Sequence, residues 1–441
     1  MMMPEKVKVS IIMPSLNVKE YIDEAVESVR EQTLEDIEII CIDARSTDGT
    51  REKIAKHAEE DPRIVVIDSP IKSYGHQVNM GLDAAKGKYV AILETDDYVD
   101  RDMYGSLYDM ASSFGLDYIK CDYDSYFTDE NGERVFSRRR VGRSGELYDR
   151  PFTPCEHPDV AFDDWYLWNG IYSAKFLKNA GIRFSETPGA AFQDVGFLHR
   201  TTSWAKKVRY IDRSLYRYCV SRPGASSKSD KTLFFIRQEY GLLFDEIEEV
   251  TRAVKTGEDG INAVYSLLYR RLAKSFARAC MDSSDDFLAT DDAQEMLGWL
   301  RWHLIEGTNR GYVSLDMLPQ GLKAAYSHLI PKNDFILYRK NRAYDFDLFL
   351  GNTHPVVIFG CGMYGREALQ YIRDLGREVS FFMDNSDKLW GKTVEGITVK
   401  DPQTIKEMPG DTRFVVANEN HAEEIASQIN TYVHEERIRI Y

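Results

Sequence analysis

The chain has 441 residues, of which 43% are hydrophobic and 29% are charged, and its formal net charge is −15. This length predicts about two to four domains, and the apolar content argues against wholesale disorder. The acidic balance argues against nucleic acid as the main partner, because a phosphate backbone is bound chiefly by Lys and Arg.

Strands and helices alternate over the first part of the chain. Apolar runs predict strands at residues 7–13, 37–42, 64–67 and 89–93. Helical patterns separate these strands at residues 20–32, 50–58 and 77–85. This order predicts an open α/β sheet with parallel strands, whose ligands bind beyond the carboxyl ends of the strands.

The pattern changes twice further along the chain. Short aromatic-rich strands between residues 118 and 227 are expected to complete the first domain. Residues 228–350 show helical periodicity and little β pattern, and strand and helix alternate again from residue 356. We therefore expect an α/β domain at residues 1–227, a helical domain at residues 228–350 and a small α/β domain at residues 351–441.

Three polar loops follow strands of the first domain and are expected to meet at one edge of its sheet. The first loop offers the Ser15 hydroxyl and the Asn17 amide, which can hold a base or a ribose but are equally typical of helix caps. The second contains Asp48, a candidate helix cap, and Asp43 at the strand tip, which a capping role explains less well.

The third loop is acidic, with Glu94, Asp96 and Asp97 directly after a buried strand. Carboxylates this close repel one another, and their pKa values would rise unless a cation neutralised them. Oxygen ligands suit Mg²⁺ or Mn²⁺, which would join one carboxylate to a substrate diphosphate. The alternative is a solvated acidic turn.

These loops together resemble the catalytic domain of glycosyltransferase family 2, which has the GT-A fold. The resemblance covers about residues 7–227. The segments that carry it are residues 14–17, 43–50, 74–81, 85–89 and 94–97. It implies an inverting glycosyltransferase that moves a sugar from a nucleotide-diphosphate sugar to an acceptor hydroxyl.

The resemblance also implies roles for individual residues. The family's DxD-like motif, which holds the metal and the diphosphate, maps onto residues 94–96. Asp96 is then the ligand of Mg²⁺ or Mn²⁺, and Glu94 faces the ribose or the metal. The donor-binding residues implied in this way are Pro14, Ser15, Asn17, Asp43, Tyr74, Gln77, Asn79, Glu94, Asp96 and Arg222.

The chain departs from the family pattern at two positions of the donor site. Glu94 replaces the first Asp of the motif, and Ala44 replaces an Asp that often contacts uracil. The loss of that acceptor leaves the base of the donor open.

A candidate catalytic base lies in the second half of the domain. Residues 168–172 and 192–197 resemble the acceptor side of the family, where an acidic pair opens a helix. Here the pair is Gln193-Asp194, so Asp194 is the candidate base, which would take the proton of the acceptor hydroxyl as it attacks the anomeric carbon. The alternative is an acid that complements a helix N-terminus. Arg222 lies in a basic loop that either closes over the diphosphate or simply links two domains.

The last domain contains a glycine motif directly after the strand at residues 356–359. Gly360, Gly362 and Gly365 open a helix, and Asp384 ends the next strand, as in Rossmann-like nucleotide-binding domains. The stretch from Asp384 onwards also resembles small Rossmann-like modules attached to sugar-modifying enzymes. We expect either a second nucleotide or nucleotide-sugar site or a structural role such as a dimer contact.

The remaining expectations concern location and partners. Six scattered cysteines without a CxxC pair, and the lack of a signal peptide or of an apolar run of about 20 residues, predict a cytoplasmic protein. The positive charges of Arg270, Arg271, Lys274 and Arg278 suggest either contact with the inner face of the cell membrane or a solvated helix face.

The expected function is a step of cell-surface polysaccharide synthesis with a glycan, lipid-linked or protein acceptor. One alternative is an NAD-dependent oxidoreductase built on residues 360–365. The other is a non-catalytic nucleotide-sugar-binding assembly protein, which Ala44 and Gln193 would favour. A homo-oligomer is compatible with each of these.

Overall fold

The computed structural model describes residues 7–128, 132–142, 147–220, 232–254, 258–318, 323, 326, 346–351, 354–418 and 421–441. The chain divides into two compact units. The first comprises Met1–Ser125 and Arg138–Val313, and the second comprises Tyr126–Ser137 and Ser314–Tyr441. The domain boundaries expected from the sequence stay a prediction, and the helices up to Val313 lie in the same compact unit as the first sheet.

The first unit is built on a mixed sheet with the strand order β3-β2-β1-β4-β8-β6-β9-β5, and β7 pairs with β6. The strands are β1 (Val9–Ser15), β2 (Ile37–Asp43), β3 (Ile64–Asp68), β4 (Tyr89–Ile92), β5 (Tyr98–Val99), β6 (Tyr118–Thr128), β7 (Arg134–Arg139), β8 (Gly170–Ser173) and β9 (Val208–Cys219). Strands β1 to β4 pair in parallel, whereas β8 is antiparallel to β4 and β6. The predicted α/β sheet with parallel strands is confirmed for β1 to β4.

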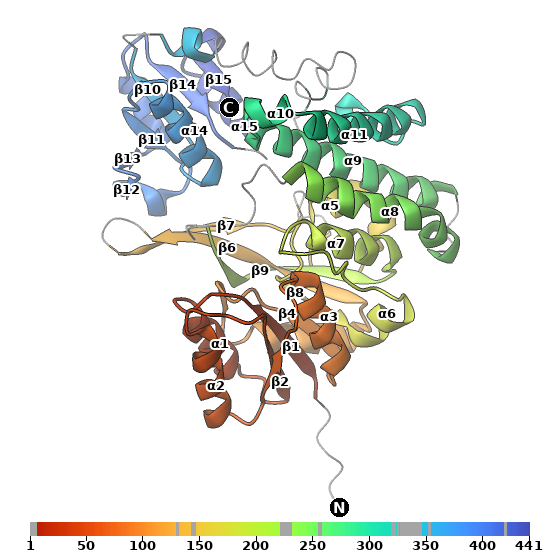
Figure 1. Ribbon diagram of the computed structural model, residues 1–441. Coiled ribbons are helices and arrows are strands. Elements are labelled where there is room, and N and C mark those ends of the chain that lie inside the picture. The colour runs from red at the N-terminus through yellow and green to blue at the C-terminus, as the bar shows by residue number, and fades with distance from the viewer. Residues whose placement is uncertain are drawn as a thin grey trace, which may run out of the picture. The chain divides into compact units, whose positions relative to one another are not determined.

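Helices cover both faces of the parallel strands. They are α1 (Ile22–Arg30), α2 (Thr50–Glu60) and α3 (Tyr74–Ala84), followed by α4 (Met103–Phe114), α5 (Pro158–Asp163), α6 (Ala174–Asn179) and α7 (Gln193–Trp204). Helices α1 and α2 lie on one face and α3 lies on the other (Figure 1), as right-handed crossovers require when the strand order reverses at β1. The carboxyl ends of β1 and β4 flank this reversal, where α/β sheets bind ligands.

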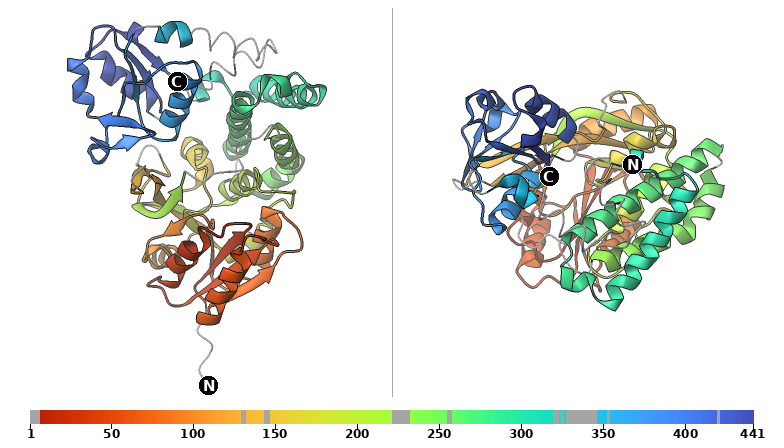
Figure 2. Two further views of the ribbon diagram at one scale, coloured as in Figure 1. Left: turned by 60° about the vertical axis from the view of Figure 1, so that its left-hand side comes forward. Right: turned by 90° about the horizontal axis from the view of Figure 1, so that it is seen from above.

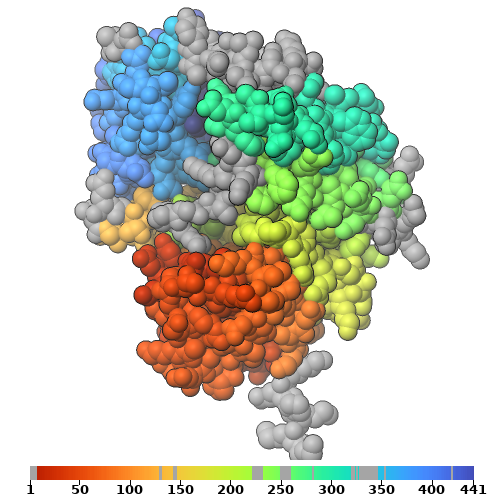
Figure 3. Space-filling view, viewed as in Figure 1, coloured from red at the N-terminus to blue at the C-terminus, as the bar shows by residue number. Residues whose placement is uncertain are grey.

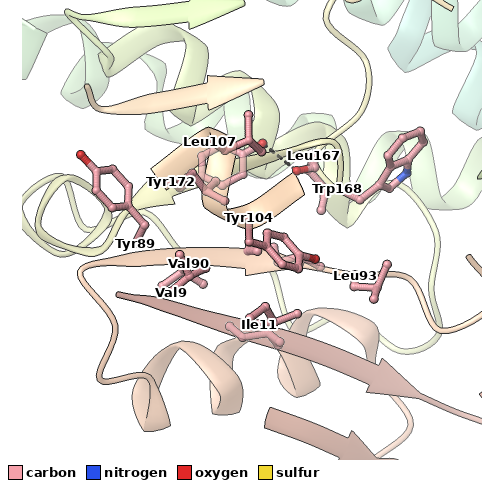
Figure 4. Packing of buried hydrophobic residues seen from close by; sticks show 14 of the residues in the cluster. Val9, Ile11, Tyr89, Val90, Leu93, Tyr104, Leu107, Leu167, Trp168 and Tyr172 are labelled. Atoms are coloured by element: carbon pink, nitrogen blue, oxygen red, sulfur yellow. Dashed lines mark hydrogen bonds between the residues drawn. The ribbon is translucent and has the colours of Figure 1, made fainter. Parts of the chain in front are cut away.

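The core of the first unit lies between the sheet and these helices. Every residue of β1 and β2 is buried, which explains why both strands read as nearly continuous apolar runs. Val9 and Ile11 of β1 pack near Tyr89 and Val90 of β4 (Figure 4). Tyr172 lies on β8, the next strand of the sheet, where it is paired with Val90. The Tyr172 hydroxyl remains satisfied because it donates to the Leu167 carbonyl at 2.9 Å.

The helical region begins with two long helices. Its members are α8 (Thr232–Val254), α9 (Glu258–Asp282), α10 (Asp285–Leu288) and α11 (Asp291–Asn309). Helices α8, α9 and α11 pack side by side (Figure 2). None of the helices in the described residues is both long enough and apolar enough to cross a bilayer.

Two basic side chains of α9, Arg270 and Arg271, are buried against other parts of the protein. The suggested membrane contact is therefore wrong for these two residues. Arg271 is 1% exposed and donates to the carbonyls of Ala161 and Asp164 at 3.0 and 3.1 Å. Arg270 is 6% exposed and pairs with Asp159 at 2.7 Å. A buried guanidinium cannot rest on a lipid headgroup, because its donors already serve the protein.

The second unit is a smaller α/β unit with the strand order β12-β13-β11-β10-β14-β15. Its elements are β10 (Val356–Phe359), α14 (Met363–Asp374), β11 (Phe381–Met383), β12 (Thr393–Val394), β13 (Ile397–Lys400), β14 (Arg413–Val416), α15 (Ala422–Asn430) and β15 (Ile438–Ile440). The described strand pairs are parallel except β12 with β13. Phe127 and Val135 of the β6–β7 hairpin belong to the core of this unit.

Candidate active site

The structure brings the three predicted loops together at the carboxyl ends of β1, β2 and β4. Ser15 lies beside Asp43 in the register of β1 and β2. The Thr95 hydroxyl donates to the Pro14 carbonyl at 2.9 Å, which ties the acidic loop to the end of β1. Polar groups from three separate segments therefore share one edge of the sheet.

The loop after β1 interlocks with the loop after β2. Asn17 has a positive φ of 53°, and its Oδ1 accepts from the Thr47 amide at 2.9 Å. The backbone amide of Asn17 in turn donates to Ser46 Oγ at 2.9 Å. The Asn17 side chain thus holds the loop together, and a role in donor binding stays a prediction.

Asp43 and Asp48 have different roles in the second loop. Asp48 accepts from the Thr50 amide at 3.0 Å and from the Lys19 amide at 3.0 Å, so it holds the loop before α2. It is not the N-cap residue of α2, as the capping interpretation expected, because that position is taken by Gly49. Asp43 is 2% exposed, and its Oδ2 accepts from the Ser46 amide at 2.9 Å. Its Oδ1 is buried and has no hydrogen-bond partner among the described residues. An unsatisfied buried acceptor is costly, so this oxygen is a candidate contact for a bound ligand.

The three acidic residues after β4 differ in their surroundings. Asp97 is 2% exposed and accepts from the Tyr216 hydroxyl at 2.7 Å and from the Cys219 amide at 2.7 Å. Burial raises the pKa of the Asp97 carboxyl well above its ordinary value, and the negative charges of Asp96 and Glu94 raise it further. Asp97 therefore anchors β9 to the acidic loop, whereas Glu94 and Asp96 are only partly buried.

A divalent cation fits the remaining two carboxylates. Burial raises the pKa of Asp97, and the charges of Asp96 and Glu94 raise it further. Burial also raises the pKa of Tyr216, followed by the charge of Asp97 and then by those of Glu94 and Asp96. A cation beside them would offset this concentration of negative charge. Among the described residues, no group of three or more His, Cys, Asp or Glu side chains is arranged as a metal site. Two carboxylates completed by water and a diphosphate are the coordination that Mg²⁺ commonly takes.

Tyr74 contacts the acidic loop and lies within electrostatic reach of Asp194 in α7. Its hydroxyl donates to Glu94 Oε1 at 2.5 Å. Burial raises the pKa of the Tyr74 hydroxyl well above its ordinary value, followed by the charge of Glu94 and then that of Asp194. The carboxylate predicted to face the donor and the predicted catalytic base therefore both act on one phenol.

Asp194 lies in the first turn of α7, where the helix dipole favours a negative charge. It is partly buried, and this burial raises the pKa of its carboxyl above the ordinary value, although the local backbone amides lower it. A raised pKa makes the carboxylate a stronger base. The preceding residue, Gln193, donates to the Thr187 carbonyl at 2.7 Å and so holds the loop before α7.

Two predicted donor ligands have structural contacts instead. Gln77 is buried, and its Nε2 donates to the carbonyls of Ser15 and Ile42 at 3.0 and 2.8 Å. Asn79 is buried, and its Nδ2 donates to the Phe184 carbonyl at 3.0 Å and to Glu186 Oε1 at 2.9 Å. These contacts use both amide N–H groups of Asn79, so they offer no support for a direct role in donor binding. Arg222 lies outside the described residues.

An aromatic cluster beside the acidic loop was missed by the sequence reasoning. The ring of Trp168 stacks on the rings of Tyr216 and Tyr218, with ring centroids 4.1 and 5.1 Å apart. The charges of Asp97, Asp96 and Glu94 contribute to a raised pKa of Tyr218, after burial and Tyr166. The alternating tyrosines of β9 were the available signal, but only the fold places them beside Trp168.

In the second unit, the glycine motif has clear structural reasons. Gly360 has a φ of 99°, which favours glycine, and a Cβ on Gly365 would lie 1.9 Å from the Gly360 carbonyl oxygen. Gly362 is the N-cap residue of α14. The Asp384 carboxylate accepts from the Cys361 amide at 3.3 Å and from the Ser386 amide at 2.9 Å.

A cavity of about 340 Å³ lies at the carboxyl ends of β10 and β11, with Gly360 and Asp384 in its wall. Asn385, His421 and Glu424 also line it, and none of the described lining residues is Lys or Arg.

A mixed sheet whose parallel strands bring carboxylates together at their carboxyl ends is typical of a ligand-binding α/β protein. Residues 10–171 match the family model of Glycosyl transferase family 2. A second family model, described as C2185-like, N-terminal, matches residues 352–439.

Several known proteins and solved structures are similar to this chain. The chain is 29% identical over 211 residues to the uncharacterized glycosyltransferase EpsJ of Bacillus subtilis, which covers 48% of this chain and 60% of that protein. It is 26% identical over 226 residues to the poly(ribitol-phosphate) beta-glucosyltransferase of Bacillus spizizenii, covering 49% of this chain and 33% of the relative. The structure of S. aureus TarS 1-349 in complex with UDP-GlcNAc is similar with a TM-score of 0.55 at 16% identity, over 77% of this chain and 92% of that one. At this identity the structural likeness shows a shared fold.

Proposed function

We propose that the first unit transfers a hexosyl group from a nucleotide-diphosphate sugar to an acceptor hydroxyl with inversion, in the synthesis of a cell-surface polysaccharide. The observation that carries the proposal is the position of Tyr74, whose hydroxyl binds Glu94 at 2.5 Å and whose pKa is raised by burial, by Glu94 and by Asp194. Tyr74 thus contacts the acidic loop directly and lies within electrostatic reach of the candidate base. In a single displacement the donor and the attacking hydroxyl must meet between these groups.

In this proposal Asp194 is the general base. Its carboxylate takes the proton of the acceptor hydroxyl while that oxygen attacks the anomeric carbon from the face opposite the diphosphate. The oxygen–carbon bond forms as the bond to the diphosphate breaks, and the anomeric configuration inverts. Burial raises the pKa of Asp194, which supports this role, because a stronger base accepts the proton more readily.

Asp96 and Glu94 are the residues that would hold Mg²⁺ or Mn²⁺. A bound cation of this kind supplies positive charge that stabilises the departing diphosphate. The partial exposure of both carboxylates supports this role, since they are accessible whereas Asp97 is enclosed. Asp43, with a buried oxygen free of partners in the described part of the chain, is the proposed contact to the nucleoside.

The class of acceptor is inferred from relatives. One relative is named for glucosyl transfer to poly(ribitol phosphate), and one similar structure contains UDP-GlcNAc. Both names fit a cell-surface polymer as the acceptor and a nucleotide sugar as the donor. The match covers less than two thirds of EpsJ, so the proposal concerns the chemistry of the matched region in particular.

A thermal-shift measurement on the full chain tests donor binding. A donor that binds the folded state stabilises it by about 2.7 kcal/mol at a concentration one hundred times its Kd. We expect one class of nucleotide sugar to raise the melting temperature only when Mn²⁺ or Mg²⁺ is present, and Asp96→Asn to abolish the shift. The matched control is Asp245→Asn, an exposed carboxylate on α8. The proposal is contradicted if no nucleotide sugar shifts the wild-type protein, or if Asp96→Asn behaves as the control does.

The second unit is proposed to be a Rossmann-like module for a small polar ligand. Its parallel strands and the cavity beside Gly360 and Asp384 support this proposal. The described residues that line the cavity include Asp384, Asn385 and His421, which offer polar groups to such a ligand. Saturable binding of NAD to the full chain, lost on Asp384→Ala, would revive the oxidoreductase alternative.

A further inference from the structure

The helical region contributes a buried carboxylate that the proposed chemistry does not use. Glu239 lies on α8, is 1% exposed and accepts a hydrogen bond from the Ser185 hydroxyl through Oε2. Its other oxygen, Oε1, is buried and finds no hydrogen-bond partner within the described residues. A buried carboxylate that is half satisfied costs free energy, so its retention calls for a physical explanation.

The Glu239 carboxylate packs against the first turn of α7. A Cβ placed on Gly196 would lie 1.9 Å from Glu239 Oε1, so only a glycine allows the two to approach this closely. Gly196 follows Asp194 by two residues in the first turn of the helix. Helices α7 and α8 pack against each other, and Figure 3 shows their yellow and green surfaces next to one another.

The same carboxylate also contacts the segment that supports Tyr74. Ser185, which donates to Glu239, has its carbonyl oxygen 1.9 Å from the place where a Cβ on Gly75 would be. Gly75 follows Tyr74 at the start of α3. Glu239 therefore reaches α3 through Ser185 and α7 through Gly196, and two glycines make these close approaches possible.

The charges around Glu239 come from both α7 and α8. Burial raises the pKa of the Glu239 carboxyl to about 7, with Asp194 and Glu246 adding to the increase and Ser185 and Arg200 opposing it. Arg200 is held by Glu246 at 2.8 Å, and its NH1 is buried without a partner in the described chain. Like Glu239 Oε1, this NH1 lies close to the position of a Cβ on Gly196, at 2.9 Å.

We propose that Glu239 is a positioning residue that holds the first turn of α7, and with it Asp194, at a fixed place relative to Tyr74. The inference rests on the proposed function, because it assigns a role toward the base of that reaction. Glu239 acts through packing and one hydrogen bond at two helix starts. The helical region would thus be part of the catalytic architecture, since it fixes where the base stands.

The test uses three variants of the full chain. Glu239→Ala removes both contacts, and Glu239→Gln keeps the volume and the acceptor for Ser185 but cannot ionise. Asp245→Ala removes an exposed carboxylate from the same helix. The measurements are kcat, the donor KM, the pH dependence of kcat, and hydrogen exchange of amides 76–78 and 194–198.

We expect Glu239→Ala to lower kcat by about 10-fold to 100-fold, the scale expected for a displaced catalytic group, and to leave the donor KM unchanged. Exchange at both helix starts should become faster. Below the pKa of about 7 of Glu239, Glu239→Gln should have the wild-type kcat. Its plot of kcat against pH should lack the ionisation step that the wild-type plot shows near that pH. Asp245→Ala should match the wild type in every measurement.

The inference is overturned if Glu239→Ala resembles Asp245→Ala in kcat and exchange. It is also overturned if Glu239→Gln, which keeps the volume and the acceptor for Ser185, loses 10-fold or more in kcat below the pKa of about 7 of Glu239, a result that decides the matter even where Glu239→Ala does not fold. Failure of the proposed function looks different, because the wild-type protein would then turn over no nucleotide sugar. The exchange measurement needs no substrate and still decides whether Glu239 holds the two helix starts.

Discussion

The Tyr74 hydroxyl and the Glu94 carboxylate are joined by a hydrogen bond of 2.5 Å between the start of α3 and the loop after β4. A hydrogen bond to an ionised group is stronger than one between neutral groups. It fixes the orientation of Glu94 before any donor arrives. The charge of Asp194 also raises the pKa of Tyr74, after burial and Glu94, so this phenol lies within electrostatic reach of both carboxylates.

Removing the hydroxyl of Tyr74 should weaken the donor site and leave the fold intact. Hydrogen bonds to charged groups contribute about 1.5–3 kcal/mol, so Tyr74→Phe should lower kcat/KM by about 10-fold to 100-fold. Steady-state kinetics with a nucleotide sugar measure this. The matched control is Tyr89→Phe, which removes a buried hydroxyl that donates to the Ala111 carbonyl at 2.8 Å. Equal kinetic losses in the two variants would contradict a special role for Tyr74.

Asp97 should make the stability of the protein depend on pH. Burial raises its pKa in the folded state, so the folded state binds this proton more tightly than the unfolded state. Its contribution to the free energy of unfolding is therefore largest below the ordinary value of 3.8 and falls as the pH rises toward the raised pKa. Asp97→Asn removes this dependence. Urea unfolding at several pH values measures this. The free energy of unfolding of the variant should increase relative to that of the wild type as the pH rises, and a difference between the two that does not change with pH would refute the assignment.

The buried pair of Lys120 and Asp164 should be important for stability. Their charged atoms are 2.5 Å apart, and both side chains are 1% exposed. Lys120→Met leaves Asp164 without this partner and should lower the free energy of unfolding by about 3–5 kcal/mol. Arg213 pairs with Asp102 at the same distance, with side chains 45% and 46% exposed. Arg213→Ala should therefore cost less than about 1 kcal/mol, and equal losses would speak against the buried pair.

The glycine motif of the second unit should be needed for packing. A Cβ on Gly365 would lie 1.9 Å from the Gly360 carbonyl oxygen, which forces α14 away from the loop after β10. Gly365→Ala should destabilise the unit by about 1–3 kcal/mol, as expected for overpacking. Gly410→Ala is the control, because nothing lies within 4 Å of its added Cβ. The explanation fails if thermal unfolding shows the two variants to be equally stable.

The sequence predicts the parallel half of the first sheet well, because its apolar runs and helix patterns are local signals. The strand expected at residues 37–42 is observed at Ile37–Asp43, and that expected at residues 356–359 is observed at Val356–Phe359. Helix α3 begins at Tyr74 and not at the predicted residue 77, because Ser73 accepts from the His76 amide and so caps the helix. That capping signal was visible in the sequence but went unused.

Other features depend on contacts between residues far apart in the chain. Asp97 was grouped with its acidic neighbours, but its partners Tyr216 and Cys219 reach it only after β9 returns to the sheet. Glu239 offered no sequence signal, because its neighbours Ser185 and Gly196 precede α8 and belong to other elements. Arg271 was expected on a helix face that contacts the membrane or the solvent, although the fold buries it against Asp164. Local patterns thus predict elements and loop chemistry, while the fold decides which polar side chains are enclosed.

The most direct test of the central claim is the turnover of a nucleotide sugar by Asp194→Asn compared with wild type, with donor binding measured in parallel. Loss of a general base costs about 100-fold to 10,000-fold in rate, so we expect kcat to fall by that factor while donor affinity stays unchanged. Asp194→Asn keeps the size of the side chain and its place in the first turn of α7. A variant that turns over the donor at the wild-type rate would contradict the assignment of Asp194 as the base.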